Sequence, residues 1–188
     1  MPSSEFTNIP LILQYAKCQK PTSILDVGVG CGKYGMLFRE YLDGHWFGKA
    51  FHNPSTWSIR MIGVEVFAEY ITPVHAYLYT DIWTGDFNEI LPSIHERFDM
   101  ILFGDVLEHF EKEKALQLVR DCKRILADNG SIVISTPNFD TNLTRENGVF
   151  GNIYECHRCR LSATDFDNLG YSVQVDSDRL LTVFLENK

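Results

Sequence analysis

A glycine-rich turn between an apolar run and a helical run constrains the fold of this chain more than any other feature. Residues 24–27 are apolar except for one acid, which is typical of a short buried strand. Glycines follow at every second position from 28 to 32, and a helical run over 36–42 ends at Asp43-Gly44. Glycine permits a tight turn against which a ligand can press, and the helix behind it presents unpaired N–H groups. This order predicts the opening of a nucleotide-binding βαβ unit.

The spacing of the glycines separates the nucleotide-binding patterns. A P-loop is excluded, because Val27 stands where its first glycine would be and Tyr34 where its serine or threonine would be. A dinucleotide pattern, G-x-G-x-x-G, begins at Gly30 but lies late relative to the strand. No acid at the end of a second strand follows it about 20 residues later. A better fit is D-x-G-x-G-x-G, formed by Asp26, Gly28, Gly30 and Gly32.

Acids also follow the next two predicted strands. Residues 60–65 form a strand that ends in Glu65, whose two oxygens can accept hydrogen bonds from both hydroxyls of a ribose. Val66, just beyond it, can form an apolar wall against an adenine. A third strand is predicted over 76–82, followed by Asp86 and Phe87. Asp86 can accept a hydrogen bond from an adenine amine while Phe87 stacks nearby, or it can simply cap the helix over 88–95.

The second half of the chain continues the alternation of strands and helices. Near-continuous apolar residues over 98–104 predict a strand covered on both faces, with Asp105, Glu108 and His109 at its carboxyl end. A helix over 111–127, closed by residues 128–130, precedes a fifth strand over 131–136. Two alternating strands, 171–175 and 180–185, then predict a closing hairpin. We therefore predict an α/β fold with one Rossmann-like, doubly wound, mostly parallel sheet of seven strands and a C-terminal antiparallel hairpin.

Taken together, these motifs resemble the class I S-adenosylmethionine (SAM) dependent methyltransferases that act on small molecules. The run from Phe98 to His109 is similar to a signature of that family, and so are Thr136-Pro137-Asn138 and the segment 155–166. The resemblance implies SAM as cofactor and S-adenosylhomocysteine (SAH) as product. It also implies cofactor contacts by Asp26, Gly28, Gly30 and Gly32 to the methionine end, Glu65 and Val66 to the ribose and adenine, Asp86 and Phe87 to the adenine, and Asp105 and Leu107 beside the cofactor.

The same resemblance implies transfer of a methyl group to an oxygen, nitrogen or carbon nucleophile. His157 and His109 are the candidate bases for an acceptor proton, because imidazole titrates near neutral pH. Alternatively, His109 only begins a helical turn. Two other functions remain open: a non-catalytic SAM-binding regulatory domain, and a nicotinamide (NAD) dependent oxidoreductase that uses the later glycine pattern.

Length, charge and cysteine spacing limit the remaining possibilities. The 188 residues fit a single methyltransferase domain, with an N-terminal helical segment over 1–20, a long loop or insertion over 44–58 and a polar loop over the site at 139–161. The net charge of −8 argues against nucleic acid and favours a small-molecule acceptor. No apolar run could span a bilayer and no signal peptide is evident, so a cytoplasmic protein is expected. We interpret Cys156 and Cys159 as reduced thiols and predict no metal site.

Overall fold

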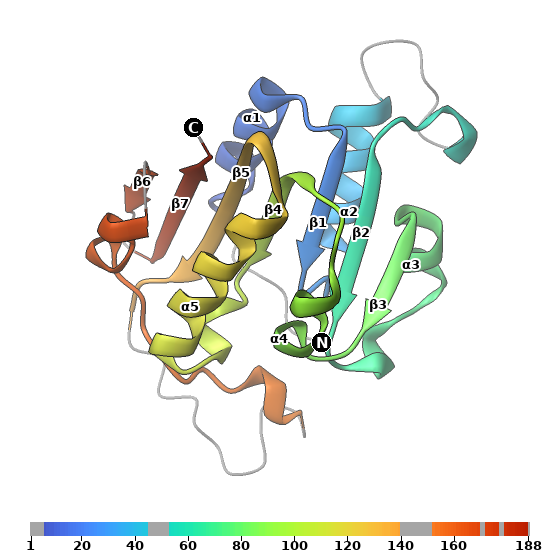
Figure 1. Ribbon diagram of the computed structural model, residues 1–188. Helices are drawn as coiled ribbons and strands as arrows, with labels where there is room; N and C mark the ends of the chain where they lie inside the picture. Colours follow the sequence, from blue (N-terminus) through green and yellow to red (C-terminus); the bar gives the residue numbers. More distant parts are fainter. Residues whose placement is uncertain (1–5, 45–52, 140–151, 170–171, 177–178, 188) are drawn as a thin grey trace.

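A twisted sheet with helices on both faces organises the molecule (Figure 1). The computed structural model describes residues 6–44, 53–139, 152–169, 172–176 and 179–187. Within these residues the sheet has the strand order β3-β2-β1-β4-β5-β7-β6. The first five strands in this order are parallel, and β7 is antiparallel to both of its neighbours. The strands are β1 (Ser23–Val27), β2 (Arg60–Glu65), β3 (Asp81–Thr84), β4 (Phe98–Gly104), β5 (Leu126–Pro137), β6 (Ser172–Asp176) and β7 (Leu180–Glu186).

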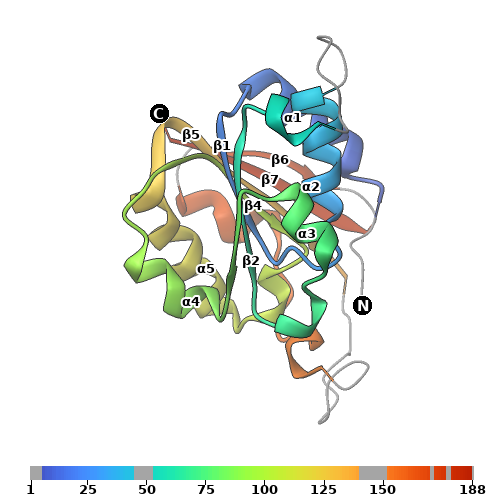
Figure 2. The same cartoon turned by 90° about the vertical axis from the view of Figure 1, so that its right-hand side faces the viewer.

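The helices divide into two layers, which Figure 2 shows with the sheet seen near its edge. One face carries α1 (Ile9–Gln19), α2 (Lys33–Phe38) and α3 (Pro73–Leu78), and the other carries α4 (Phe87–Ile90) and α5 (Lys112–Cys122). Buried side chains form one apolar cluster under each layer. The predicted α/β class, with a mostly parallel sheet between helices, is confirmed.

The central strands are apolar on both faces, and this explains their sequences. In β1, Ile24 packs in the cluster of α1 and α2, whereas Leu25 and Val27 pack in the cluster of α5. Side chains alternate between faces along a strand, so the only acid of the strand, Asp26, points toward α2 and α3. Asp26 is 2% exposed. A charged side chain is thus placed inside the molecule, directly below the glycine turn.

Several predicted boundaries are wrong. The helix predicted over 88–95 is shorter: α4 ends at Ile90 and a 3₁₀ turn (Leu91–Ser93) follows. Two other differences have a clear physical cause. Residues 76–78, expected in the third strand, belong to α3, and β3 begins only at Asp81. A capping box explains the helix: Pro73 lies in its first turn, and the Thr72 backbone N–H donates to Nδ1 of His75 at 3.0 Å.

The second of these differences concerns the helix predicted over 111–127. It ends at Cys122, followed by a 3₁₀ turn (Lys123–Ile125), and β5 already begins at Leu126. The reason is tertiary, because Leu126 pairs with Phe98 of β4 across a register shift. Asn129, expected to help close the helix, instead has a left-handed φ of 62° near the start of the strand.

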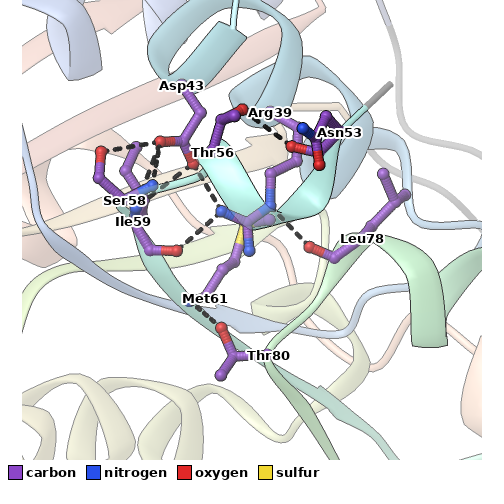
Figure 3. Close-up of polar contacts among 9 residues, drawn as sticks. All are labelled: Arg39, Asp43, Asn53, Thr56, Ser58, Ile59, Met61, Leu78 and Thr80. Carbon is purple, nitrogen blue, oxygen red and sulfur yellow. Dashed lines mark hydrogen bonds and ion pairs between the residues drawn. The ribbon is translucent and has the colours of Figure 1, made fainter. Parts of the chain in front are cut away.

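A buried arginine anchors the chain around the 44–58 segment (Figure 3). Arg39 donates to the carbonyls of Leu78 and Ile59, each at 2.7 Å, and to Asp43 at 2.6 Å. Asp43 in turn accepts from the backbone N–H of Ser58 at 2.7 Å. The network therefore joins the π-helical turn after α2 to the start of β2 and the end of α3. Residues 45–52 lie outside the described part of the chain.

Candidate active site

A cavity of about 520 Å³ lies at the carboxyl ends of the parallel strands. Its walls come from the loops that follow β1, β2, β3, β4 and β5, and from residues 152–158. This edge of an open α/β sheet is where ligands bind. None of residues 53–58 lines the cavity, so the described part of the long 44–58 loop packs at the opposite, amino end of β2. Of the polar segment predicted over 139–161, several residues between 152 and 158 line the cavity, while 140–151 lie outside the described residues.

The glycine turn supplies bare backbone to one wall. Gly28 has φ 76° and Gly30 has φ 52°, both in the left-handed region that favours glycine. A Cβ on Gly28 would lie 2.4 Å from Cγ2 of Val106, whereas a Cβ on Gly30 would meet no atom within 4 Å. Gly28 is therefore required by close packing, and Gly30 borders open space in the cavity.

Glu65 joins the turn after β1 to the turn after β2. Its Oε2 accepts from the backbone N–H of Gly30 at 3.0 Å, and its Oε1 accepts from that of Phe67, also at 3.0 Å. Each carboxylate oxygen has two lone pairs, so both can accept a further hydrogen bond from a ligand. Glu65 and its neighbour Val66 line the cavity.

Asp86 and Phe87 also line the cavity, at the end of β3. Asp86 caps α4: its Oδ1 accepts from the backbone N–H of Asn88 at 2.9 Å and from the Asn88 side-chain amide at 2.7 Å. Phe87 is 3% exposed and meets the ring of Phe103 edge-on, with centroids 5.8 Å apart. Both interpretations of Asp86 are thus compatible with its position, because a capping residue here also borders the cavity.

Three predicted contact residues lie behind the wall. Asp26 accepts a hydrogen bond of 2.5 Å from the Tyr79 hydroxyl, and burial raises the pKa of its carboxyl to about 7, assisted by the charge of Glu65 and opposed by the Tyr79 hydrogen bond. Gly32 packs against the side chain of Leu78. Leu107 is fully buried in the cluster of α5. These residues support the cavity wall, and their side chains do not line it.

Asp105 lines the cavity in a backbone conformation that is rare for a residue with a side chain. Its φ is 57°, and its N–H donates to the carbonyl of Ser135 at 2.8 Å. The Ser135 hydroxyl donates to Oδ1 of Asp105 and accepts from the Asn8 amide. This chain of hydrogen bonds connects the start of α1 to the cavity. No local sequence pattern predicts it, because Asn8 and Ser135 are 127 residues apart.

The two candidate histidines lie together. The rings of His109 and His157 meet edge-on with centroids 4.9 Å apart, and both line the cavity. Burial lowers the pKa of His109 to about 4, with a further contribution from His157, and burial also lowers the pKa of His157. Both imidazoles are therefore neutral at pH 7 and retain a lone pair.

Glu108, next to His109, is a site residue to which the sequence analysis gave no role of its own. It lines the cavity, it is 1% exposed, and Thr136 Oγ1 donates to its Oε2 at 3.2 Å. Burial, with the nearby charge of Asp105, raises the pKa of its carboxyl well above the usual range. Its place at the carboxyl end of β4, beside Asp105 and His109, is the sequence signal that could have identified it.

The two nearby cysteines, Cys156 and Cys159, are free thiols and are at least partly buried. The thiol of Cys159 donates to the carbonyl of Leu107 at 3.7 Å, and partial burial raises its pKa to about 11. Cys156 is buried. Neither is in a disulfide.

An unpartnered hydroxyl provides a test of whether a polar ligand fits the cavity. The hydroxyl of Tyr34, at the start of α2, is buried and has no hydrogen-bond partner among the described residues, and Tyr34 lines the cavity. Such a group is costly to leave unsatisfied. With the open space above Gly30, it fits a ligand that carries polar atoms across the glycine turn.

Several solved structures share this fold. A SAM-dependent methyltransferase from Archaeoglobus fulgidus is 14% identical, with a TM-score of 0.63 over 95% of this chain and 92% of that one. The O-methyltransferase TomG from Streptomyces achromogenes, solved with SAM, is 14% identical, with a TM-score of 0.59 over 100% and 84%. The N-methyltransferase NodS from Bradyrhizobium japonicum, solved with SAH, is 16% identical, with a TM-score of 0.58 over 94% and 84%. Other similar chains are longer, and this chain covers 53% of PhzM.

Sequence comparison gives a more specific result. A family model described as a methyltransferase domain matches residues 6–173. No curated protein matches the sequence. Among the described residues, no helix has the length and apolarity to cross a bilayer. Because the family match covers most of the chain and the fold agrees with it, the chain belongs to the class I SAM-dependent methyltransferases.

Proposed function

We propose that this domain methylates a small-molecule acceptor bound beside His109 and His157. The observation that carries the proposal is a single cavity whose walls include both the glycine turn with Glu65 and Asp86 and the two histidines. Its volume of about 520 Å³ is typical of small-molecule sites. The structures of TomG and NodS, an O- and an N-methyltransferase, have the same fold, which supports oxygen or nitrogen as the accepting atom.

The loops after β1, β2 and β3 form the cofactor part of this cavity. The backbone at Gly28 and Gly30 lies against the methionine end, Glu65 accepts hydrogen bonds from the ribose hydroxyls, and Asp86 accepts one from the adenine amine. Val66 and Phe87 flank the adenine. Asp105 accepts from the cofactor's amino group, with Asp26 and Gly32 holding the turn from behind and Leu107 supporting the wall below.

The protein mainly aligns the two reactants and excludes water. When bound, SAM would supply the methyl group, whose bond to sulfur would be replaced by a bond to the acceptor atom, with the electron pair left on sulfur. His157 and His109 activate the acceptor, whose proton must leave when oxygen or nitrogen is methylated. We assign the base to His157, because burial lowers the pKa of His109 to about 4 and so makes its imidazole a weak base.

Transfer of labelled methyl groups from SAM to a pool of metabolites tests this function. We expect a labelled small molecule to form, and we expect the labelling to fall by about 10²-fold or more in His157→Ala, the usual contribution of a positioned base. His95→Gln, at an exposed position, is the control and should label the pool as the wild type does.

Two results would overturn the proposal. SAH binding without labelling of any metabolite would favour a regulatory SAM-binding domain. Labelling confined to added protein or nucleic acid would exclude a small-molecule acceptor.

A further inference from the structure

Three side chains with metal-binding atoms converge where the turn after β4 meets residues 153–158. The ligand atoms of Glu108, His109 and His157 all lie within 4.8 Å of one another. We propose that these three residues bind a divalent transition-metal ion, which holds the acceptor's nucleophilic oxygen. The acceptor part of the inference rests on the proposed function, whereas metal binding by itself does not.

The spacing suits one ion. Metal bonds to histidine nitrogen and carboxylate oxygen are about 2.0–2.2 Å long, which places neighbouring ligand atoms roughly 3–3.5 Å apart. Small side-chain rotations bring a set that already lies within 4.8 Å to this spacing. Three protein ligands also leave coordination positions open, as catalytic metal sites require.

Hydrogen bonds hold the ligands from behind. Nδ1 of His109 lies 3.2 Å from the carbonyl oxygen of Cys156, and because a carbonyl only accepts, Nδ1 carries the proton and Nε2 the lone pair. The hydroxyl of Thr136 donates to Glu108. Metal-binding histidines and carboxylates usually have such outer partners, which fix the ring's tautomer and orientation.

The two ligand-bearing segments are also joined through their backbones. The N–H groups of Arg158 and Cys159 donate to the carbonyl of Glu108, at 2.7 and 3.2 Å. His157 therefore comes from a segment that is fastened to the turn carrying the other two ligands. A set assembled in this way loses little freedom when it binds an ion.

The surroundings of Glu108 are a further reason to expect a cation. Its side chain is 1% exposed, and among the described residues no lysine or arginine forms an ion pair with it. A bound cation would compensate the charge of a carboxylate buried at this position. Two nitrogen ligands with one oxygen favour ions such as Mn²⁺, Fe²⁺, Co²⁺ or Zn²⁺ over Mg²⁺ or Ca²⁺. In this arrangement the ion, rather than His109 or His157, would activate the acceptor: it would lower the pKa of the acceptor hydroxyl, whose proton then leaves to solvent.

Calorimetric and spectroscopic titration with Co²⁺ tests the site in the chelator-treated protein. We expect one Co²⁺ per chain, visible absorption bands from nitrogen and oxygen ligands, and displacement by Zn²⁺. Glu108→Gln and His157→Gln should each weaken binding by at least 10-fold, while His95→Gln should bind as the wild type does. Failure to bind, or equal binding by all variants, would overturn the proposal. A strong ultraviolet thiolate band would assign the ion to Cys156 and Cys159 instead and overturn it as well.

SAH titration of the same samples separates this inference from the proposed function. SAH should bind each variant with unchanged affinity, because none of the three substituted residues, Glu108, His157 and His95, is assigned a cofactor contact. Such binding also shows that the variants fold. SAH binding without Co²⁺ binding would overturn the metal site alone. Co²⁺ binding without SAH binding would support the metal site and contradict the proposed function.

Discussion

At the scale of single residues, two glycines of the turn look alike in the sequence but have different surroundings in the structure. Gly28 and Gly30 both have left-handed φ values, but only Gly28 lies against another residue, the β-branched Val106. A β-branched side chain is stiff at χ1 and cannot easily move aside. The first glycine is therefore required by the fold and the second by what occupies the cavity.

Alanine substitution should separate these two requirements. Gly28→Ala should lower the free energy of unfolding by more than about 2 kcal/mol, because it adds both backbone strain and a collision with Val106. Gly30→Ala should cost only about 1 kcal/mol, from the strained φ, yet should weaken SAH binding. Chemical denaturation and SAH calorimetry measure the two effects. Equal stability losses in the two variants would contradict the assignment.

Asp26 should make the stability depend on pH. Its folded pKa of about 7 lies above the unfolded value, so between roughly pH 4 and pH 7 the folded state holds more protons and the free energy of unfolding falls as pH rises. Asp26→Asn removes this titration. As pH rises from 4 to 8, the free energy of unfolding of the variant should therefore increase by roughly 2–4 kcal/mol relative to that of the wild type. Urea denaturation across this range, with the exposed Asp167→Asn as control, measures the gain. A gain independent of pH would contradict it.

At the scale of elements, Arg39 joins segments that the sheet alone does not connect. Its guanidinium bonds two carbonyls and Asp43, and its plane lies over the ring of Trp57, 4.5 Å from the centroid. The end of α3 and the start of β2 are thereby fixed to the turn after α2. This places residues 53–58, the described end of the long loop, at the amino ends of the strands, away from the cavity.

Removal of this arginine should destabilise the protein strongly. Arg39→Ala leaves the buried Asp43 carboxylate without its cation, a change that typically costs about 3–5 kcal/mol. Arg60→Ala, which breaks the exposed pair with Glu96, should cost less than about 1 kcal/mol. Thermal and urea denaturation compare the two. A similar loss in both variants would show that the buried network contributes no more than a surface pair.

At the scale of the whole molecule, the cofactor should stabilise the fold by binding only the folded state. SAH at 100 times its dissociation constant adds about 2.7 kcal/mol, which corresponds to a rise in Tm of roughly 5–10 °C for a chain of this size. NAD at the same concentration should leave Tm unchanged, because the glycine pattern is not that of a dinucleotide site. A shift with NAD and none with SAH would favour the oxidoreductase alternative.

The sequence predicted the central sheet well because its strands carry strong, local signals. The strands β2 and β4 begin and end where their apolar runs do, since both faces of these strands are covered. The edge strand β3 was misplaced because its four residues are only partly buried or exposed, so no apolar run marks them. The start of β5 was missed because pairing with β4, rather than local propensity, ends α5.

In the site, too, features with a local sequence signal were predicted and features set by tertiary contacts were not. Glu65 and Asp86 were predicted to contact the ribose and the adenine because each follows a strand, and both line the cavity because these strands end at the same edge of the sheet. The hydrogen bond from the Asn152 amide to the Tyr70 hydroxyl, between two residues of the cavity wall, could not be predicted. These residues are 82 positions apart, and neither belongs to a motif.

The position of β7 between β5 and β6 has a consequence for biosynthesis. A ribosome makes β6 before β7, yet in the described sheet β6 pairs with β7 alone. The segment 172–176 therefore waits, unpaired, until the following strand has emerged and joined β5. The later strand, β7, must therefore pair with β5 before the earlier strand, β6, can join the sheet. A nascent chain that stalls before residue 180 would expose the unpaired backbone groups of β5 to chaperones or to other chains.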